Sequence, residues 1–165
     1  MMRTKLCIGA AIFAIIFAAI FCVRLWQPEH QALLHTEHLL NAAGNRDWRK
    51  VAAFLDDSYT DRWGHDKASA ISDARTALQQ FFSLRLASDP GVPLTIHLNG
   101  ERAEVTMRLK MEGSGTAFAQ EVKRSINSLR APFTFEWRRK SWKPWDWQLV
   151  RADNAELQID KNTGR

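Results

Sequence analysis

One stretch of this chain has no charged residue, and the long remainder after it has no cysteine. Residues 6–23 carry no charged side chain, and residues 1–26 hold three basic residues but no acid. The only two cysteines, Cys7 and Cys22, also lie there. Residues 27–165 therefore have no thiol, which excludes a cysteine nucleophile, a cysteine-ligated zinc site and a structural disulfide from that part of the chain.

Motifs that bind nucleotides or activate a serine are missing too. The sequence has no P-loop, dinucleotide-binding glycine fingerprint, nucleophile elbow or two-histidine zinc helix, and enzymes that depend on them are excluded. The chain has 23 basic and 18 acidic residues, but beyond position 26 the balance is 20 to 18. A domain so close to neutral gives no electrostatic sign of a nucleic-acid partner. We therefore expect no cofactor and no nucleic acid.

The uncharged stretch is long enough to cross a membrane. Eighteen helical residues span about 27 Å, close to the ~30 Å hydrocarbon core of a bilayer. Lys and Arg are more frequent before it than after it, so we expect a cytoplasmic N-terminus and an extracytoplasmic domain, periplasmic in a bacterium. The alternative is a cleaved or lipidated signal sequence, which needs small residues at its processing site, whereas Phe21 precedes Cys22. A single-pass anchor at residues 1–26 is the favoured interpretation.

Hydrophobic periodicity predicts three helices after a short linker at residues 27–31. The first begins at Ala32 and ends at Gly44, because apolar residues recur at helical spacing between them. Asn45 is expected to cap the second helix, over residues 48–55. An extended segment follows at residues 57–63. The third helix is expected to begin near Asp66 and to continue its apolar stripe to Phe81 or Phe82.

The remainder of the domain, to residue 155, is predicted to be mainly strands. Residues 92–98 and 102–111 alternate apolar and polar side chains around Asn99-Gly100, a two-residue turn sequence. Pairing Leu98 with Glu101 would place both apolar sets on one face, and would place His97 opposite Arg102. A helix is expected over residues 116–129, strands over 133–137 and 147–151, and a polar tail over 156–165. The prediction is an α+β fold in which three helices cover a curved antiparallel sheet.

Two segments resemble a known superfamily. Residues 44–48 (Gly-Asn-Arg-Asp-Trp) and 55–59 (Leu-Asp-Asp-Ser-Tyr) are similar to the opening of nuclear transport factor 2-like proteins, which include ketosteroid-isomerase-like and polyketide-cyclase-like members. The order of elements matches, and residues 147–154 resemble the last strand of that superfamily. The resemblance implies a cone-shaped, cystatin-like fold around an apolar pocket, for which the candidate lining residues are Tyr59, Trp63, Phe81, Met107, Phe135 and Trp147.

The same resemblance implies a candidate catalytic residue. Asp61 matches best the general-base carboxylate of ketosteroid-isomerase-like members, and Tyr59 and Trp63 would give it apolar surroundings. Those enzymes also stabilise an enolate with a tyrosine from the first helix and a protonated acid from the sheet, which this chain lacks. A base without such donors accelerates a reaction little. Alternatively, Asp61 pairs with Arg62, Arg75 or a backbone amide.

Residues 137–147 combine four tryptophans with four basic residues. This mixture suits a lipid headgroup interface or a protein partner, and the candidate contact residues are Arg138, Arg139, Lys140, Trp142, Lys143 and Trp145. The simpler interpretation is a hairpin in which Trp137 and Trp147 fill the core and the basic residues are solvated. Binding of single-stranded nucleic acid is disfavoured by the expected extracytoplasmic location.

Other titratable residues are expected at the surface. Asp56 and Asp57 are predicted to form a water-facing pair at a helix end. His35 and His38 have a spacing that can hold a metal, but no third ligand is evident, and we place both on the solvated side of the first helix. We therefore predict no metal site.

These observations favour a membrane-anchored extracytoplasmic module that binds or assembles and is not catalytic. The alternative is a small-molecule isomerase, hydratase or cyclase with Asp61 as its base. The partners to expect are the membrane, a small apolar ligand, a protein and, by analogy with the resembling family, a second copy of the chain.

Overall fold

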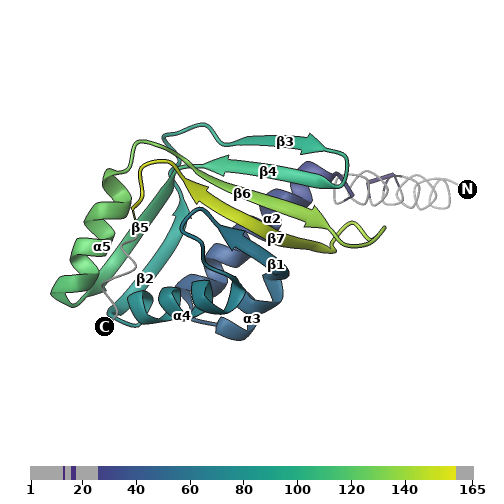
Figure 1. The fold of residues 1–165 in the computed structure, drawn as a ribbon. Helices are drawn as coiled ribbons and strands as arrows, with labels where there is room; N and C mark the ends of the chain where they lie inside the picture. Colours follow the sequence, from purple (N-terminus) through teal and green to yellow (C-terminus); the bar gives the residue numbers. More distant parts are fainter. Residues whose placement is uncertain (1–12, 14–15, 18–25, 159–165) are drawn as a thin grey trace, which may run out of the picture.

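The computed structural model of the chain describes residues 13, 16, 17 and 26–158. Within residues 26–158 it has four helices and seven strands (Figure 1). The helices are α2 (Pro28–Gly44), α3 (Trp48–Phe54), α4 (Lys67–Leu78) and α5 (Ala117–Ser128). The strands are β1 (Leu55–Asp61), β2 (Phe81–Ser88), β3 (Thr95–Asn99), β4 (Arg102–Met107), β5 (Leu109–Gly115), β6 (Phe133–Arg139) and β7 (Trp147–Asn154).

The predicted membrane span at residues 6–23 lies outside the described residues except at three positions. Phe13, Ile16 and Phe17 are helical and have exposed side chains. Among the residues that the structure describes, no helix is both long and apolar enough to cross a bilayer. The anchor and its orientation stay predictions.

The strands form a mixed sheet of five and a separate pair. The large sheet has the order β1-β7-β6-β4-β3, and β2 pairs with β5. The α+β class is confirmed, but the expectation of a purely antiparallel sheet is wrong, because β1 runs parallel to β7. This pairing joins the first strand to the last one, and local sequence patterns carry no sign of such a distant partner. Helices α2, α3 and α4 lie on one side of the large sheet, and α5 lies at one end (Figure 1).

Strand β2 is not anticipated by the helical pattern. Helix α4 ends at Leu78, and Phe81 begins a strand that pairs with β5. Leu78 and Phe81 are both buried at a spacing of three, so the strand start mimics a continuing helical stripe. The predicted strand at 102–111 is divided near Arg108, where the chain passes from the large sheet to the β2–β5 pair.

The β3–β4 hairpin is present, but its predicted register is wrong by two residues. Leu98 pairs with Ala103 and His97 with Glu104, so the tight turn is Gly100-Glu101. A shift of two preserves the face on which each side chain lies. Ala103 and Val105 are therefore still buried, and His97 is still exposed, as expected.

Side-chain caps begin α3, α4 and α5 but not α2, and the sequence predicts the cap of α4. Asp66 caps α4 by accepting from Ser69 N–H at 2.8 Å, with the reciprocal capping-box bond also present. Asn45 is not the cap of α3, because Asp47 accepts the Lys50 N–H instead. Helix α2 begins at Pro28, earlier than predicted, since a proline needs no hydrogen-bond acceptor in the first turn.

The main core lies between α2 and the large sheet. Trp137, at the centre of β6, is fully buried, and its indole Nε1–H donates to Thr36 Oγ1 on α2 at 2.9 Å. A buried indole N–H without an acceptor would be costly. This bond therefore fixes the sheet against the helix.

Candidate functional site

A cavity lies between β1, α4, α5 and residues 157–158. Its volume is about 460 Å³, within the range of small-molecule sites. The walls are mainly apolar, with polar groups from β1, from His65 before α4 and from the middle of α4 among them. The lining residues are Tyr59, Asp61, Trp63, His65, Ala70, Asp73, Ala74, Ala77, Phe118, Val122, Ser125, Ile126, Leu157 and Gln158.

Asp61 ends β1 at this cavity and is only 7% exposed. Its Oδ1 accepts the backbone N–H groups of Trp63 at 2.9 Å and His65 at 2.8 Å. Its Oδ2 lies 2.8 Å from Nδ1 of His65. Both oxygens are therefore engaged in hydrogen bonds. Asp61 therefore pairs with backbone amides, which is one of the alternatives to a role as general base. Arg62, another suggested partner, pairs with Asp153 instead.

His65 links Asp61 to the cavity. With Nδ1–H donating to Asp61, the other ring nitrogen, Nε2, is left for a second partner. Nε2 lies 3.4 Å from a carboxylate oxygen of Asp73 on α4, whose side chain is 62% exposed. The ring itself is largely buried. The arrangement is a carboxylate that orients an imidazole, and the imidazole can hold or move a proton.

Tyr59 lines the same cavity and is buried. Burial raises the pKa of its phenol above the ordinary value, the negative charge of Asp61 raises it further, and Arg151 opposes both. Tyr59 is therefore a protonated phenol at neutral pH and can donate a hydrogen bond.

The start of the predicted polar tail forms part of the cavity wall. Asn154 Oδ1 accepts the backbone N–H groups of Glu156 and Leu157. The carbonyl oxygen of Leu157 in turn accepts the Trp63 indole N–H at 2.8 Å. Leu157 is thus held against Trp63 at the edge of the cavity.

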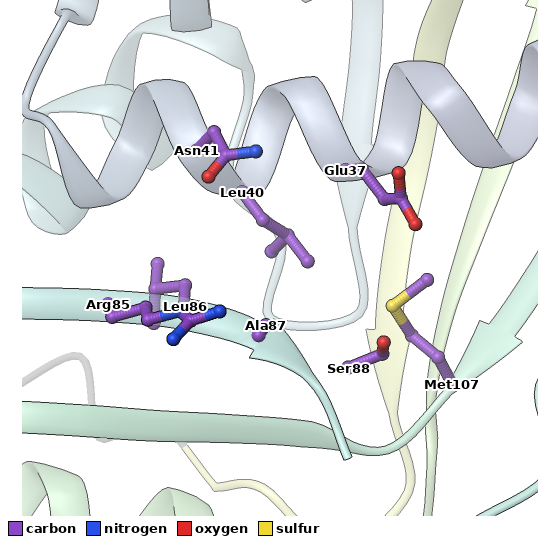
Figure 2. Close-up of a pocket in the computed structure, with 8 residues that line it drawn as sticks. All are labelled: Glu37, Leu40, Asn41, Arg85, Leu86, Ala87, Ser88 and Met107. Carbon is purple, nitrogen blue, oxygen red and sulfur yellow. The ribbon is translucent and has the colours of Figure 1, made fainter. Parts of the chain in front are cut away.

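The other suggested pocket residues lie elsewhere. Phe135 and Trp147 are buried in the main core, and Phe81 is buried in a second cluster beneath α5. Met107 lines a separate cavity of about 160 Å³ between α2 and β2, where Figure 2 shows Leu40 pointing from the helix towards the strand. That volume is below the usual size of a ligand site.

Asp56 lies on the same strand as Asp61 but in different surroundings. The predicted water-facing position is wrong, because Asp56 is 2% exposed. It lies 2.9 Å from Arg138 and 2.8 Å from Lys140, and it accepts from both the backbone and the hydroxyl of Ser58. Burial raises its pKa, but the bonds from Lys140, Ser58 and Arg138 outweigh burial and hold it well below its usual range. Asp57 is exposed, as predicted, beside Lys67.

The candidate contact residues of the β6–β7 connection divide into two groups. Arg138 and Lys140 pair with Asp56, and the Arg139 guanidinium lies 6.0 Å from the Trp147 ring centroid. Trp142, Lys143 and Trp145 are exposed.

His35 departs from its predicted solvated position, while His38 is exposed as expected. The His35 ring is half-buried between the edges of Phe54 and Trp137, and Nε2 lies 3.0 Å from the carbonyl oxygen of Trp145. Within the described residues, no group of three or more ligand-type side chains could hold a metal.

Comparison with solved structures identifies the fold. A nuclear transport factor 2-like protein of unknown function from Pseudomonas putida superposes with a TM-score of 0.55 and 14% identity, over 83% of this chain and 91% of that one. The chain has a nuclear transport factor 2-like fold. A protein of that family from Streptomyces avermitilis, provisionally named a dehydratase, gives a TM-score of 0.55 at 10% identity, over 79% and 96% of the two chains.

The longer protein Bd1075 from Bdellovibrio bacteriovorus gives a TM-score of 0.57 at 15% identity. The match covers 79% of this chain but 41% of that one. No protein-family model and no curated protein matches this chain by sequence.

His65 is the residue that sequence reasoning missed. The signal was present, because Asp61 and His65 are four residues apart around Gly64, which has a φ of 80°. A glycine with positive φ forms a turn that brings flanking side chains together. The spacing of residues in the sequence does not show that α4 and α5 enclose a cavity beside Asp61 and His65.

Proposed function

We propose that the chain is a ligand-binding module whose site is the cavity between β1, α4 and α5. The observation that supports this is the cavity itself, which has apolar walls, a suitable volume and a few polar groups, among them Tyr59 and the Asp61–His65 pair. The ligand that fits is small and mainly apolar. It carries one hydroxyl or carbonyl group, which would face His65 and the Tyr59 phenol.

Filling the cavity tests this proposal. Ala74 of α4 lines the cavity, and Ala68, on the same helix, is exposed away from it. Native mass spectrometry of the full chain in detergent, under gentle and then harsh activation, is expected to release a small molecule from the wild type. Ala74→Phe should lose that mass, and Ala68→Phe should keep it. An empty wild-type protein, or equal retention by both variants, contradicts a binding role for this cavity.

The Asp61–His65 pair favours a second candidate, a small-molecule isomerase or dehydratase. In that case His65 is the base and Asp61 positions it, because both Asp61 oxygens are already engaged. Tyr59 would supply one donor to a developing oxyanion. The Streptomyces avermitilis neighbour with a provisional dehydratase name has the same fold.

Hydrogen exchange on the retained molecule separates the two candidates without a known substrate. An enzyme that removes a proton from carbon will return a deuteron in heavy water, so the ligand mass rises. This exchange should vanish in His65→Gln. A ligand that stays bound without exchange identifies a binding module.

We further propose that residues 6–23 anchor the domain to a membrane and that the domain lies on the extracytoplasmic side of that membrane. The length and the flanking charges of residues 6–23 support this. A C-terminal reporter that is active only outside the cytoplasm is the expected result, and activity only in the cytoplasm would contradict the orientation.

A further inference from the structure

The turn between β6 and β7 holds two exposed tryptophans on a rigid frame. We refer to residues 140–146 as the Trp turn. Trp142 is 76% exposed and Trp145 60% exposed. The backbone beneath them is fixed, because Lys140 N–H donates to the Asp146 carbonyl at 2.8 Å and Pro144 is buried and accepts the Trp147 indole N–H. The two indoles expose apolar surface at one turn of the fold, and an exposed apolar patch can mark a contact site for a membrane or a protein.

Most basic residues around the Trp turn already have partners within the domain. Arg138 and Lys140 neutralise the buried Asp56, and Arg139 lies over the Trp147 ring. Lys143 is exposed and forms no ion pair with any described residue. The Trp turn therefore offers two indoles and one available charge, which indicates an aromatic contact rather than an electrostatic one.

The Trp turn lies at the end of the domain from which α2 begins. His35 of α2 contacts the Trp145 carbonyl oxygen, and seven residues of helix, about 10 Å, separate His35 from Pro28. Figure 1 shows the β6–β7 connection at the same end as the start of α2, with α5 at the opposite end. Trp26, just before α2, is 58% exposed. Only Arg24 and Leu25 separate Trp26 from the uncharged stretch of residues 6–23.

The size of the exposed patch favours a lipid surface over a protein. Two tryptophans bury about 150–250 Å² each, well below the roughly 800 Å² per partner of a stable protein interface. At a membrane, by contrast, single Trp rings are favoured at headgroup level, because the ring is apolar and its N–H can still reach water.

We propose that Trp142 and Trp145 insert into the headgroup region of the membrane that holds residues 6–23, and so fix the tilt of the domain on the bilayer. The inference rests on the anchor in the proposed function and is independent of ligand binding. Because the contact is aromatic, we expect it on both zwitterionic and anionic lipid. We also expect its strength to change little with salt concentration.

Quenching by labelled lipid tests this contact in the full chain. In a Cys7→Ser/Cys22→Ser background, Lys143→Cys carries an environment-sensitive fluorophore and leaves both tryptophans in place. Ala117→Cys, exposed at the start of α5, carries the same label at the opposite end. Vesicles are phosphatidylcholine with doxyl-labelled chains, with or without phosphatidylglycerol. We expect about a twofold loss of emission at position 143 and almost none at 117, because only the first lies at headgroup depth.

A matched pair of variants assigns the effect to the tryptophans. Trp142→Ala/Trp145→Ala should abolish quenching at position 143, and Phe82→Ala, which removes another exposed aromatic ring, should not. Protein that floats with vesicles but shows equal emission loss at 143 and 117 overturns the Trp contact and leaves the anchor standing. Quenching that disappears in high salt or without phosphatidylglycerol overturns the aromatic mechanism. Protein that does not float overturns both the contact and the anchor.

Discussion

Strand β1 carries two buried carboxylates five residues apart, and their surroundings are opposite in kind. Asp56 faces two cations and a serine, so its charge is balanced inside the fold. Asp61 faces a histidine and two backbone N–H groups at the wall of a cavity. The first arrangement ties β1 to β6, which are separated in the sheet by β7. The second lies at the cavity in which we propose that a ligand binds, with Nε2 of His65 3.4 Å from Asp73. The proposed division is therefore between stability at one end of the strand and ligand binding at the other.

Removing the Asp56 charge should give the largest effect on stability. Asp56→Asn leaves Arg138 and Lys140 without their counter-charge, and we expect a loss of about 3 kcal/mol in the free energy of unfolding. Denaturant unfolding measures it. Asp57→Asn is the control, because Asp57 is 98% exposed on the same strand; its cost should stay below about 0.5 kcal/mol. Equal costs for the two variants would contradict a structural role for Asp56.

Acid should remove the same contribution. The pKa of Asp56 is lower in the folded chain than its ordinary value. Its contribution is therefore complete above the unfolded-state pKa of about 4 and declines as pH falls through the folded-state pKa. The stability gap between wild type and Asp56→Asn should be widest near neutral pH and should narrow below about pH 4. A gap that stays constant down to pH 2 would show that the charge of Asp56 is not what stabilises the fold.

Changing His65 should affect ligand binding more than folding. His65→Gln keeps a polar side chain but removes the ring that Asp61 positions, and we expect about a tenfold loss of affinity for the retained ligand, close to 1.4 kcal/mol. Titration of the ligand-free protein with the released molecule provides the measurement. His97→Gln, at an exposed position of β3, should bind like the wild type.

Lys140 should give the smallest effect in this set. Its ammonium lies 2.8 Å from Asp56, but its side chain is 41% exposed and Arg138 still pairs with the carboxylate. Lys140→Met should therefore cost less than about 1 kcal/mol. A loss of stability as large as that of Asp56→Asn would mean that Arg138 does not compensate the charge of Asp56.

Local patterns were sufficient to predict most elements. The capping aspartate of α4, the helix at 117–128 and the alternating strands β4, β6 and β7 follow from caps and periodicity over a few residues. The parallel β1–β7 pairing and strand β2 do not, because each depends on a partner distant in the chain. Asp56 shows the same limit: it is followed by Asp57 and Ser58, and its partners Arg138 and Lys140 are more than 80 residues away in the chain.

The candidate site was predicted in part for the same reason. Tyr59, Asp61 and Trp63 alternate within the extended segment predicted at residues 57–63, so their shared face could be inferred from position alone. His65 required the turn at Gly64, and the cavity walls came from α4 and α5, which the sequence does not connect to β1. The role of these residues in binding or catalysis stays a prediction.

Native mass spectrometry of Asp56→Asn and Asp61→Asn side by side tests whether the two carboxylates of β1 have different roles. Below the unfolding temperature of both variants, we expect Asp56→Asn to retain the bound small molecule in the wild-type proportion and Asp61→Asn to lose most of it. Retention that falls in both variants, or in neither, would contradict the division of β1 into a stabilising carboxylate and a ligand-site carboxylate.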